Sequence, residues 1–317
     1  MSIAIIDFGS FALGKAEPSV NEMKRLSTEF MRELNKNGFV YLKNTGIKEE
    51  QVFRAIDICR KFFLLPKEIK QKYAHSKDTE VPHHGWYDFE TESLNSENLN
   101  DLKEAFNLSA LTSNDRWPIK EVPEFSNCLE SFFRTCEELS TQILKVLALS
   151  LDVETDFFVI RHQEMGSKAN PTTLRAAYYP PIQKYSLKES QTRCGEHSDY
   201  GTFTLLFQDK SGGLEVKSRS GQYITVPYIP NTVLFNIANI LQRWTSDRWI
   251  STASVSLVRL WICALEGFQG AGLGKVVWKT SKSPLSMPPM LSKGRALGPI
   301  HLRTGVFAEQ CVVRCLA

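Results

Sequence analysis

The chain has 317 residues, of which 42% are hydrophobic and 23% charged, and its formal net charge is +3. Its length allows one large domain or two ordinary ones. A charge so near neutrality gives no electrostatic argument for binding nucleic acid or an anionic membrane surface. The first ten residues lack the basic start of a signal peptide, and the apolar stretch 255–268 is too short to cross a bilayer. We therefore expect a cytoplasmic protein with no nucleic-acid or membrane partner.

The seven cysteines follow no metal-binding or disulfide pattern. No CxxC pair occurs, and Cys311 and Cys315 have no histidine nearby that would complete a zinc site. Cys128 and Cys136 lie within a helical apolar pattern. We predict small, buried thiols in a reducing compartment.

Three amphipathic helices are predicted in the first half of the chain. The first covers about 18–38 and begins with a capping box formed by Ser19 and Glu22. The second covers about 49–65, and the proline that follows ends it. The third is the longest, about 123–151, with apolar residues recurring every three or four positions. Their apolar stripes predict packing on a common core.

Short β-rich runs replace the helical pattern after residue 172. They are separated by turn-forming pairs of Gly, Ser, Pro and Asn, a spacing typical of a barrel or sandwich rather than a doubly wound sheet. The predicted strands are 202–208, 214–217, 223–226 and 232–237.

The segment His197-Ser198-Asp199 is the main chemical motif. Side chains alternate along a strand, so residues two apart point to the same face. An imidazole nitrogen beside a carboxylate oxygen supplies two of the three ligands of the 2-His-1-carboxylate triad of non-haem Fe(II) oxygenases. The third should be a second histidine roughly fifty residues on, yet none lies between Asp199 and His301. The apolar run 202–208 follows at once, which places the pair at the mouth of a strand.

The sequence around this motif resembles the isopenicillin N synthase-like branch of the Fe(II)/2-oxoglutarate-dependent oxygenases. The resemblance runs from about residue 3 to residue 252. Among the segments that carry it are IIDF at 5–8, GFVYL at 38–42, DLKEAF at 101–106, YYPP at 178–181, GEHSDYG at 195–201, GGLEV at 212–216 and LQRWT at 241–245.

The resemblance implies a fold, two cofactors and a reaction. The fold is α+β, a double-stranded β-helix (jelly-roll) core with N-terminal helices. His197 and Asp199 would hold Fe(II). Tyr179 would contact the cosubstrate 2-oxoglutarate, as part of an Asn-x-Tyr element in which Ala177 replaces the asparagine. The expected reaction is oxidation of a small organic substrate coupled to decarboxylation of 2-oxoglutarate.

The resemblance ends after Thr252. The family continues with x-His-Arg-Val, whereas this chain has Ser254 where the distal histidine belongs. An Arg-x-Ser that clamps the far carboxylate of 2-oxoglutarate should follow some ten or more residues later, but 264–267 contains no arginine. We therefore expect the last core strands to be missing or replaced. One event, such as an alternative exon, a retained intron or a frameshift, explains both losses.

The composition changes at the same place. Residues 1–252 hold 33 acidic and 30 basic residues, whereas 253–317 hold two acidic and eight basic residues. We predict an N-terminal helical and mixed region at 1–150, a partial jelly-roll core at 151–252, and an atypical, poorly ordered basic tail at 253–317.

Several alternatives remain open at this point. His301 is one candidate for the third ligand. His83 and His84 either line a substrate mouth or lie in a solvated loop, and His75 and His162 are expected at the surface or at helix ends. For function, the chain is a working oxygenase on a small molecule, an inert truncated or aberrant isoform with at most a binding role, or a product that barely folds because core strands are lost.

Overall fold

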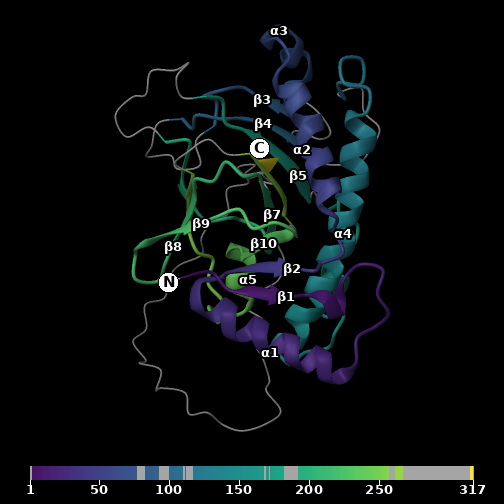
Figure 1. Ribbon diagram of the computed structural model, residues 1–317, viewed down its shortest axis with the longest axis vertical. Helices are drawn as coiled ribbons and strands as arrows, with labels where there is room; N and C mark the ends of the chain where they lie inside the picture. Colours follow the sequence, from purple (N-terminus) through teal and green to yellow (C-terminus); the bar gives the residue numbers. More distant parts are fainter. Residues whose placement is uncertain are drawn as a thin grey trace, which may run out of the picture.

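The computed structural model describes residues 2–76, 83–92, 100–109, 111, 117–167, 169–170, 172–181, 192–256, 261–266 and 315–316. These residues build a nine-stranded sheet, a four-stranded sheet and three long helices (Figure 1). None of the described helices combines the length and apolarity needed to cross a bilayer.

Each predicted helix forms within two residues of its expected bounds. Helix α1 (Val20–Asn37) begins at the capping box of Ser19 and Glu22 and ends at Gly38, whose φ of 71° is a left-handed conformation that suits glycine. Helices α2 (Glu49–Phe63) and α4 (Phe125–Ser150) follow, and α4 packs against both α1 and α2. Two short helices complete the set, α3 (Lys67–Lys70) and α5 (Asn239–Trp244).

The larger sheet has the strand order β1-β2-β10-β7-β13-β12-β5-β4-β3, with an additional pairing of β7 to β12. Its strands are β1 (Ile5–Asp7), β2 (Phe39–Lys43), β3 (Gly85–Tyr87), β4 (Glu104–Leu108), β5 (Thr173–Tyr178), β7 (Phe203–Gln208), β10 (Thr232–Ile237), β12 (Trp261–Glu266) and β13 (Cys315–Leu316). The smaller sheet has the order β6-β11-β8-β9, formed by β6 (Cys194–His197), β8 (Leu214–Lys217), β9 (Tyr223–Val226) and β11 (Ser254–Ser256). The strand predictions at 202–208, 214–217, 223–226 and 232–237 are confirmed.

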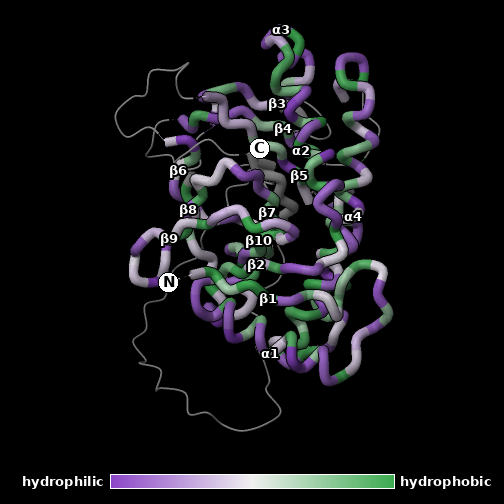
Figure 2. Tube along the Cα trace, viewed as in Figure 1, coloured by the Kyte–Doolittle hydropathy of each residue, from purple (hydrophilic) through white to green (hydrophobic). Residues whose placement is uncertain are grey.

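The helices cover one face of the larger sheet. Phe30 of α1 packs on Phe235 of β10, Phe63 of α2 stacks on Tyr178 of β5, and Phe132 of α4 meets Phe207 of β7, with ring centroids 5.2–6.1 Å apart. Figure 2 shows apolar residues along these strands and polar ones on the outer sides of the helices. Because side chains alternate, the neighbouring residues on each strand belong to the other, inner face.

The segment 253–317 contributes described strands to both sheets. Strand β11 lies between β6 and β8, and β12 lies between β5 and β7, pairing with β5 over six residues. The last strands are therefore replaced rather than missing. The physical reason is that ladder hydrogen bonds join backbone groups, so an apolar run such as WICALE forms a strand without the family's side chains. Positions 257–260, 267–314 and 317 lie outside the described residues.

Four of the cysteines are free thiols. Cys59, Cys136 and Cys194 are buried and Cys128 is half-buried. Burial raises the pKa of the Cys59 and Cys136 thiols well above the ordinary range, so both behave as small apolar groups.

Candidate metal centre

His197 and Asp199 lie side by side at the end of β6. The Nε2 atom of His197 is 3.5 Å from Oδ1 of Asp199, and the side chains are 6% and 11% exposed. The turn that carries Asp199 is fixed to the start of α5, because the backbone amide of Asn239 donates to the Asp199 carbonyl at 2.9 Å. The pair therefore has a defined position between β6 and β7.

A hydrogen bond to the backbone sets the tautomer of His197. Its Nδ1 lies 2.6 Å from the carbonyl oxygen of Gly195, an atom that only accepts hydrogen bonds, so Nδ1 carries the proton. The lone pair is then on Nε2, the nitrogen that faces Asp199. Metal-binding histidines are commonly oriented through the other ring nitrogen in this way.

The carboxylate of Asp199 is oriented by two side chains from the larger sheet. Its Oδ2 accepts from Thr204 Oγ1 at 2.7 Å and from Asn236 Nδ2 at 2.8 Å. Thr204 on β7 and Asn236 on β10 are register partners, so both lie on the inner face. Oδ1 is the oxygen that remains beside the imidazole.

This donor pair fits a transition-metal ion. Two ligand atoms at about 2.1 Å from one ion can lie as far apart as about 4 Å, and 3.5 Å is within that limit. Within the described residues no group of three His, Cys, Asp or Glu side chains is arranged to hold a metal. Ser254, 8% exposed, is the register partner of His197. His301 lies outside the described residues.

A buried ion pair between Asp101 and Lys103 is hydrogen-bonded to the backbone of β6. Asp101 Oδ1 accepts from the backbone amide of Gly195 at 2.8 Å, and its other oxygen pairs with Lys103 Nζ, each side chain being 1% exposed. Lys103 Nζ also lies 3.9 Å from Cys194 Sγ. Gly195, whose carbonyl orients His197, is thus itself held through its amide by Asp101. The segment DLKEAF carries these residues, but their function as a support was missed because the partner lies about ninety residues away.

Tyr179, the predicted cosubstrate contact, is fully buried directly after β5. Tyr178 stacks on Phe63 of α2 at 5.5 Å and so belongs to the helix-covered face. The alternation of side chains puts Ala177 and Tyr179 on the inner face, toward the side that holds Thr204 and Asn236.

Strand β12 contains no arginine that could serve as the expected clamp. On β12, Ala264 is the register partner of Arg175 on β5, and Glu266 is the partner of Thr204 on β7. Arg175 is fully buried, but its guanidinium is ion-paired with Glu92. A buried guanidinium therefore lies on the strand next to β12, and it already has a carboxylate partner.

The candidate mouth histidines differ in their surroundings. His84 is fully buried and lies edge-on to Phe106 at 5.6 Å and Trp117 at 5.2 Å. Because Phe106 packs on Phe62 of α2, His84 lies beside the helix-side core. Its burial excludes the solvated-loop alternative, and its assignment to a mouth stays a prediction. His83 is half-buried, and its assignment to a mouth stays a prediction.

His162 directly follows the short 3-10 helix η3 (Val159–Arg161), so it lies at a helix end, one of the two predicted positions, but at 2% exposed it is buried rather than at the surface. Its Nδ1 lies 2.7 Å from the Phe158 carbonyl, and its Nε2 lies 2.9 Å from Thr202 Oγ1. Burial lowers its pKa to about 4, so the ring is neutral at physiological pH. His75 is half-buried and stacks on Tyr87 with ring centroids 3.9 Å apart.

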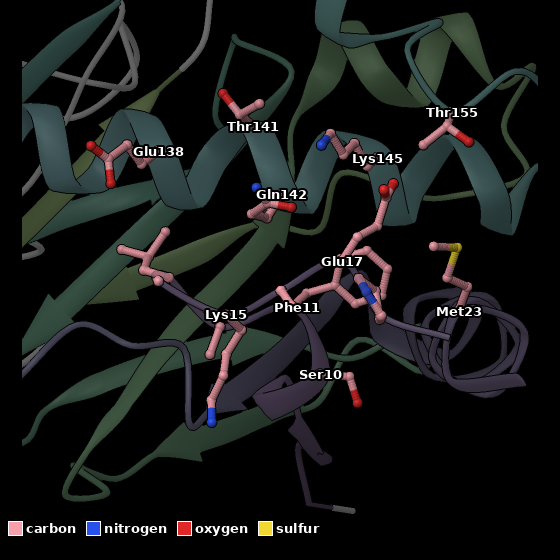
Figure 3. A pocket seen from close by; sticks show the side chains of 15 residues that line it. Ser10, Phe11, Lys15, Glu17, Met23, Glu138, Thr141, Gln142, Lys145 and Thr155 are labelled. Carbon is pink, nitrogen blue, oxygen red and sulfur yellow. The ribbon is translucent and has the colours of Figure 1, made fainter. Parts of the chain in front are cut away.

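A cavity of about 420 Å³ lies elsewhere, between the segment 10–18 and helix α4 (Figure 3). Its charged lining includes Lys15, Glu17, Glu138 and Lys145. Neither His197 nor Asp199 is among its lining residues, so it is not part of the metal centre.

Comparison with known proteins identifies the family of this chain. Residues 3–126 match the family model described as non-haem dioxygenase in morphine synthesis N-terminal, and residues 171–253 match the 2OG-Fe(II) oxygenase superfamily. The chain is 30% identical over 269 residues to the 2-oxoglutarate-dependent dioxygenase htyE of Aspergillus rugulosus, covering 79% of this chain and 78% of that protein. It is 32% identical over 253 residues to the proline hydroxylase buaE of Petromyces alliaceus, covering 76% and 75%.

Among solved structures, the chain is similar to a full-length Neurospora crassa protein in complex with alpha-KG and thymine. The TM-score is 0.72 at 26% identity, covering 84% of this chain and 85% of that one. The fold of the 2OG-Fe(II) oxygenases has a jelly-roll core, which agrees with the α+β architecture predicted here. The chain belongs to the Fe(II)/2-oxoglutarate-dependent oxygenase family.

Proposed function

We propose that this chain binds Fe(II) through His197 and Asp199 and oxidises a small organic molecule at the expense of 2-oxoglutarate. The observation that carries the proposal is the oriented pair itself. Nε2 and Oδ1 are 3.5 Å apart, while Nδ1 and Oδ2 are each engaged by the protein. Such fixed partner bonds are characteristic of metal ligands rather than of a chance His-Asp contact.

Each residue has a defined part in the proposed reaction. His197 and Asp199 hold the ion, and Asn236 and Thr204 keep the carboxylate from rotating toward bidentate binding. Bound iron supplies the redox chemistry, drawing on oxygen and the decarboxylation of 2-oxoglutarate. Tyr179, buried on the inner face, is the proposed contact for the cosubstrate. An iron ion held by these two side chains would supply the site at which cosubstrate and oxygen bind.

A second candidate is a binding role without turnover. The position of Ser254 opposite His197 favours it, because a neutral hydroxyl is a poor substitute for an imidazole ligand. The register of Ala264 beside Arg175 adds to this, since alanine offers no charge to the far carboxylate of 2-oxoglutarate.

One experiment separates the two candidates. Purified protein is mixed with Fe(II) and 2-oxoglutarate without oxygen, and the visible absorption of the metal–cosubstrate chelate is recorded. Oxygen is then admitted and succinate release is measured. An absorption band followed by succinate supports the oxygenase. A band without succinate supports binding only, and the absence of both refutes the metal centre. The His197→Ala variant provides the baseline.

The names of the relatives indicate only a broad substrate class for this chain. The Neurospora crassa structure holds thymine, and buaE is named a proline hydroxylase, so both act on or bind small molecules. A small molecule is therefore the substrate class that we propose for this chain.

A further inference from the structure

A buried polar cluster occupies the inner face at the β4–β5 end of the larger sheet. Arg175 on β5 is fully buried and donates from Nη1 to Asn107 Oδ1 on β4 at 3.1 Å. Its Nη2 pairs with Glu92, and its guanidinium carbon lies 5.4 Å from the centre of the Tyr87 ring. Arg175 and Asn107 are register partners, and the strand alternation puts both on the face opposite to Phe106 and Tyr178.

Two atoms of this cluster make no hydrogen bond of good geometry within the described part of the chain, although the Asn107 side chain also lies beside the Tyr87 hydroxyl. They are the carboxylate oxygen Oε1 of Glu92 and the amide nitrogen Nδ2 of Asn107. Glu92 is 8% exposed and Asn107 is fully buried. Burial by itself would raise the pKa of Glu92, but the charges of Arg175 and Lys103 outweigh burial and lower it, so the carboxylate is ionised.

An unpartnered acceptor and an unpartnered donor in one buried cluster are costly to stability. Both side chains accept from the same guanidinium, through Asn107 Oδ1 and Glu92 Oε2, so the two side chains are neighbours. An apolar pair of similar size would fold at lower cost. Local violations of this kind are found where a protein binds a ligand.

The cluster is close enough to the metal pair to share a substrate with it. Across the larger sheet, Arg175, Ala264 and Leu206 are successive register partners. Two strand spacings separate Arg175 from Leu206 by about 10 Å. Leu206 is two residues from Thr204, which donates to Asp199. A second path runs through Asp101, whose amide donates to the Glu92 carbonyl at 2.8 Å and whose side chain holds Gly195.

We propose that Glu92 Oε1 and Asn107 Nδ2 are the polar recognition elements of the substrate site. Their chemistry selects an amide-type group, in which an N–H lies beside a C=O, as in a lactam or a cyclic imide. The substrate N–H donates to Glu92 Oε1, and its carbonyl accepts from Asn107 Nδ2. Arg175 is a positioning residue that fixes both side chains. The inference rests on the proposed function, because it takes the iron at His197 and Asp199 as the reacting centre.

Binding of glutarimide and N-methylglutarimide tests this assignment. Affinities are measured by ligand-observed NMR on metal-free protein, because the cluster is made by protein atoms alone. The parent imide should bind at least tenfold more tightly than its N-methyl derivative, since methylation removes the N–H and adds bulk against Glu92. The variants Glu92→Gln and Asn107→Asp should each weaken glutarimide binding at least tenfold. The glutamine amide would place a donor against the imide N–H, and the aspartate would place an acceptor against the imide carbonyl.

Glu33→Gln is the matched control. Glu33 on α1 is similarly buried, and its ion-pair partners Arg32 and Lys36 lie on the same helix rather than in the cluster. Its substitution should leave imide binding unchanged. Cooperative melting of each variant checks that the fold is retained.

The proposal is overturned if wild-type protein binds the imide and its N-methyl derivative equally or binds neither. It is also overturned if folded Glu92→Gln and Asn107→Asp variants retain full affinity. Loss of the iron absorption band with imide discrimination intact would instead count against the metal centre alone, so the two failures are distinguishable.

Discussion

Ser254 on β11 is the direct register partner of His197 on β6. Side chains opposite one another in antiparallel strands have Cβ atoms about 4.5–5.5 Å apart. An imidazole at position 254 would therefore stand next to the His197–Asp199 pair, and a serine there offers only a neutral hydroxyl. The first strand after Thr252 therefore places its serine beside the candidate metal ligands, where the family has a histidine.

The Ser254→His variant should bind Fe(II) or Mn(II) at least tenfold more tightly than wild type, about 1.4 kcal/mol, because it adds an imidazole donor beside the existing pair. Metal affinity is measured by competition with a chelator. Activity should not be fully restored, because Ala264 still provides no guanidinium for 2-oxoglutarate.

The control for this variant is Ser218→His. Ser218 is a buried serine in the β8–β9 turn, where it bonds to Ser220. If both variants bind the metal equally more tightly than wild type, the added histidine acts wherever it is placed, and its register with His197 is not the cause. Full activity of the Ser254→His variant would contradict the part assigned to Ala264.

Thr204→Val should weaken metal binding by about 10–100-fold, the range seen when a hydrogen-bond partner of a metal ligand is removed. The hydroxyl of Thr204 donates to Asp199 Oδ2 at 2.7 Å, and valine keeps the shape without the donor. Titration of Mn(II) by calorimetry measures the change. Thr245→Val is the matched control, because its buried hydroxyl bonds within α5 and the turn that follows it. Similar losses in both variants would reject a specific effect on Asp199.

Glu104→Ala should lower the free energy of unfolding by about 3–5 kcal/mol, since it leaves a buried ammonium without its counter-ion. Glu104 accepts from Lys70 Nζ at 2.5 Å and from Trp86 Nε1 at 2.8 Å, and Lys70 is 6% exposed. Urea unfolding measures the loss. The exposed pair of Lys61 and Asp57 on α2 provides the comparison, and Asp57→Ala should change stability by less than about 1 kcal/mol. A small effect at Glu104 would show that Lys70 is solvated.

Stability should fall as the pH falls from about 6.5 to about 4, in part because of His162. Its folded pKa is about 4, below the ordinary value of 6.5, so the unfolded chain binds the extra proton in this window. The contribution is about 3 kcal/mol, fully present above pH 6.5 and lost as the pH approaches 4.

Urea unfolding of wild type and His162→Gln at pH 7 and pH 5 isolates this contribution. The variant should be less stable at pH 7, because it loses bonds to Phe158 and Thr202, but its stability should change less between the two values. An equal pH dependence in both proteins would mean that folding does not lower the pKa of His162.

Local patterns predicted much of the secondary structure. The capping box of Ser19 and Glu22 and the left-handed Gly38 mark the ends of α1 within the sequence itself. Likewise, the two-residue spacing of His197 and Asp199 is enough to place a nitrogen and an oxygen ligand on one side. These inferences succeed because each depends on residues only a few positions apart.

The buried charges could not be predicted in the same way. Asp101, Lys103, Glu92 and Arg175 are ordinary charged residues in the sequence, where a solvated position is the usual expectation. Arg175 pairs with Glu92 across 83 residues, and Asp101 and Lys103, which pair with each other, are buried where Asp101 also holds Gly195 of β6 across 94 residues. No local pattern encodes these distant partners. The burial of His84 and His162 was missed for the same reason, since Trp117 and Thr202, which contact them, are distant in the sequence.

The sequence by itself determined the helices, the strand runs, the His-x-Asp ligand pair and the departure from the family after Thr252. The tertiary structure decided what that departure does to the fold. It places β11 and β12 between strands that precede them, so the jelly-roll sheets are completed while the side chains at 254 and 264 remain those of the new segment. The physical reason is that backbone hydrogen bonds build a sheet from almost any β-forming run, whereas a metal ligand or a carboxylate clamp requires one particular side chain at one register position.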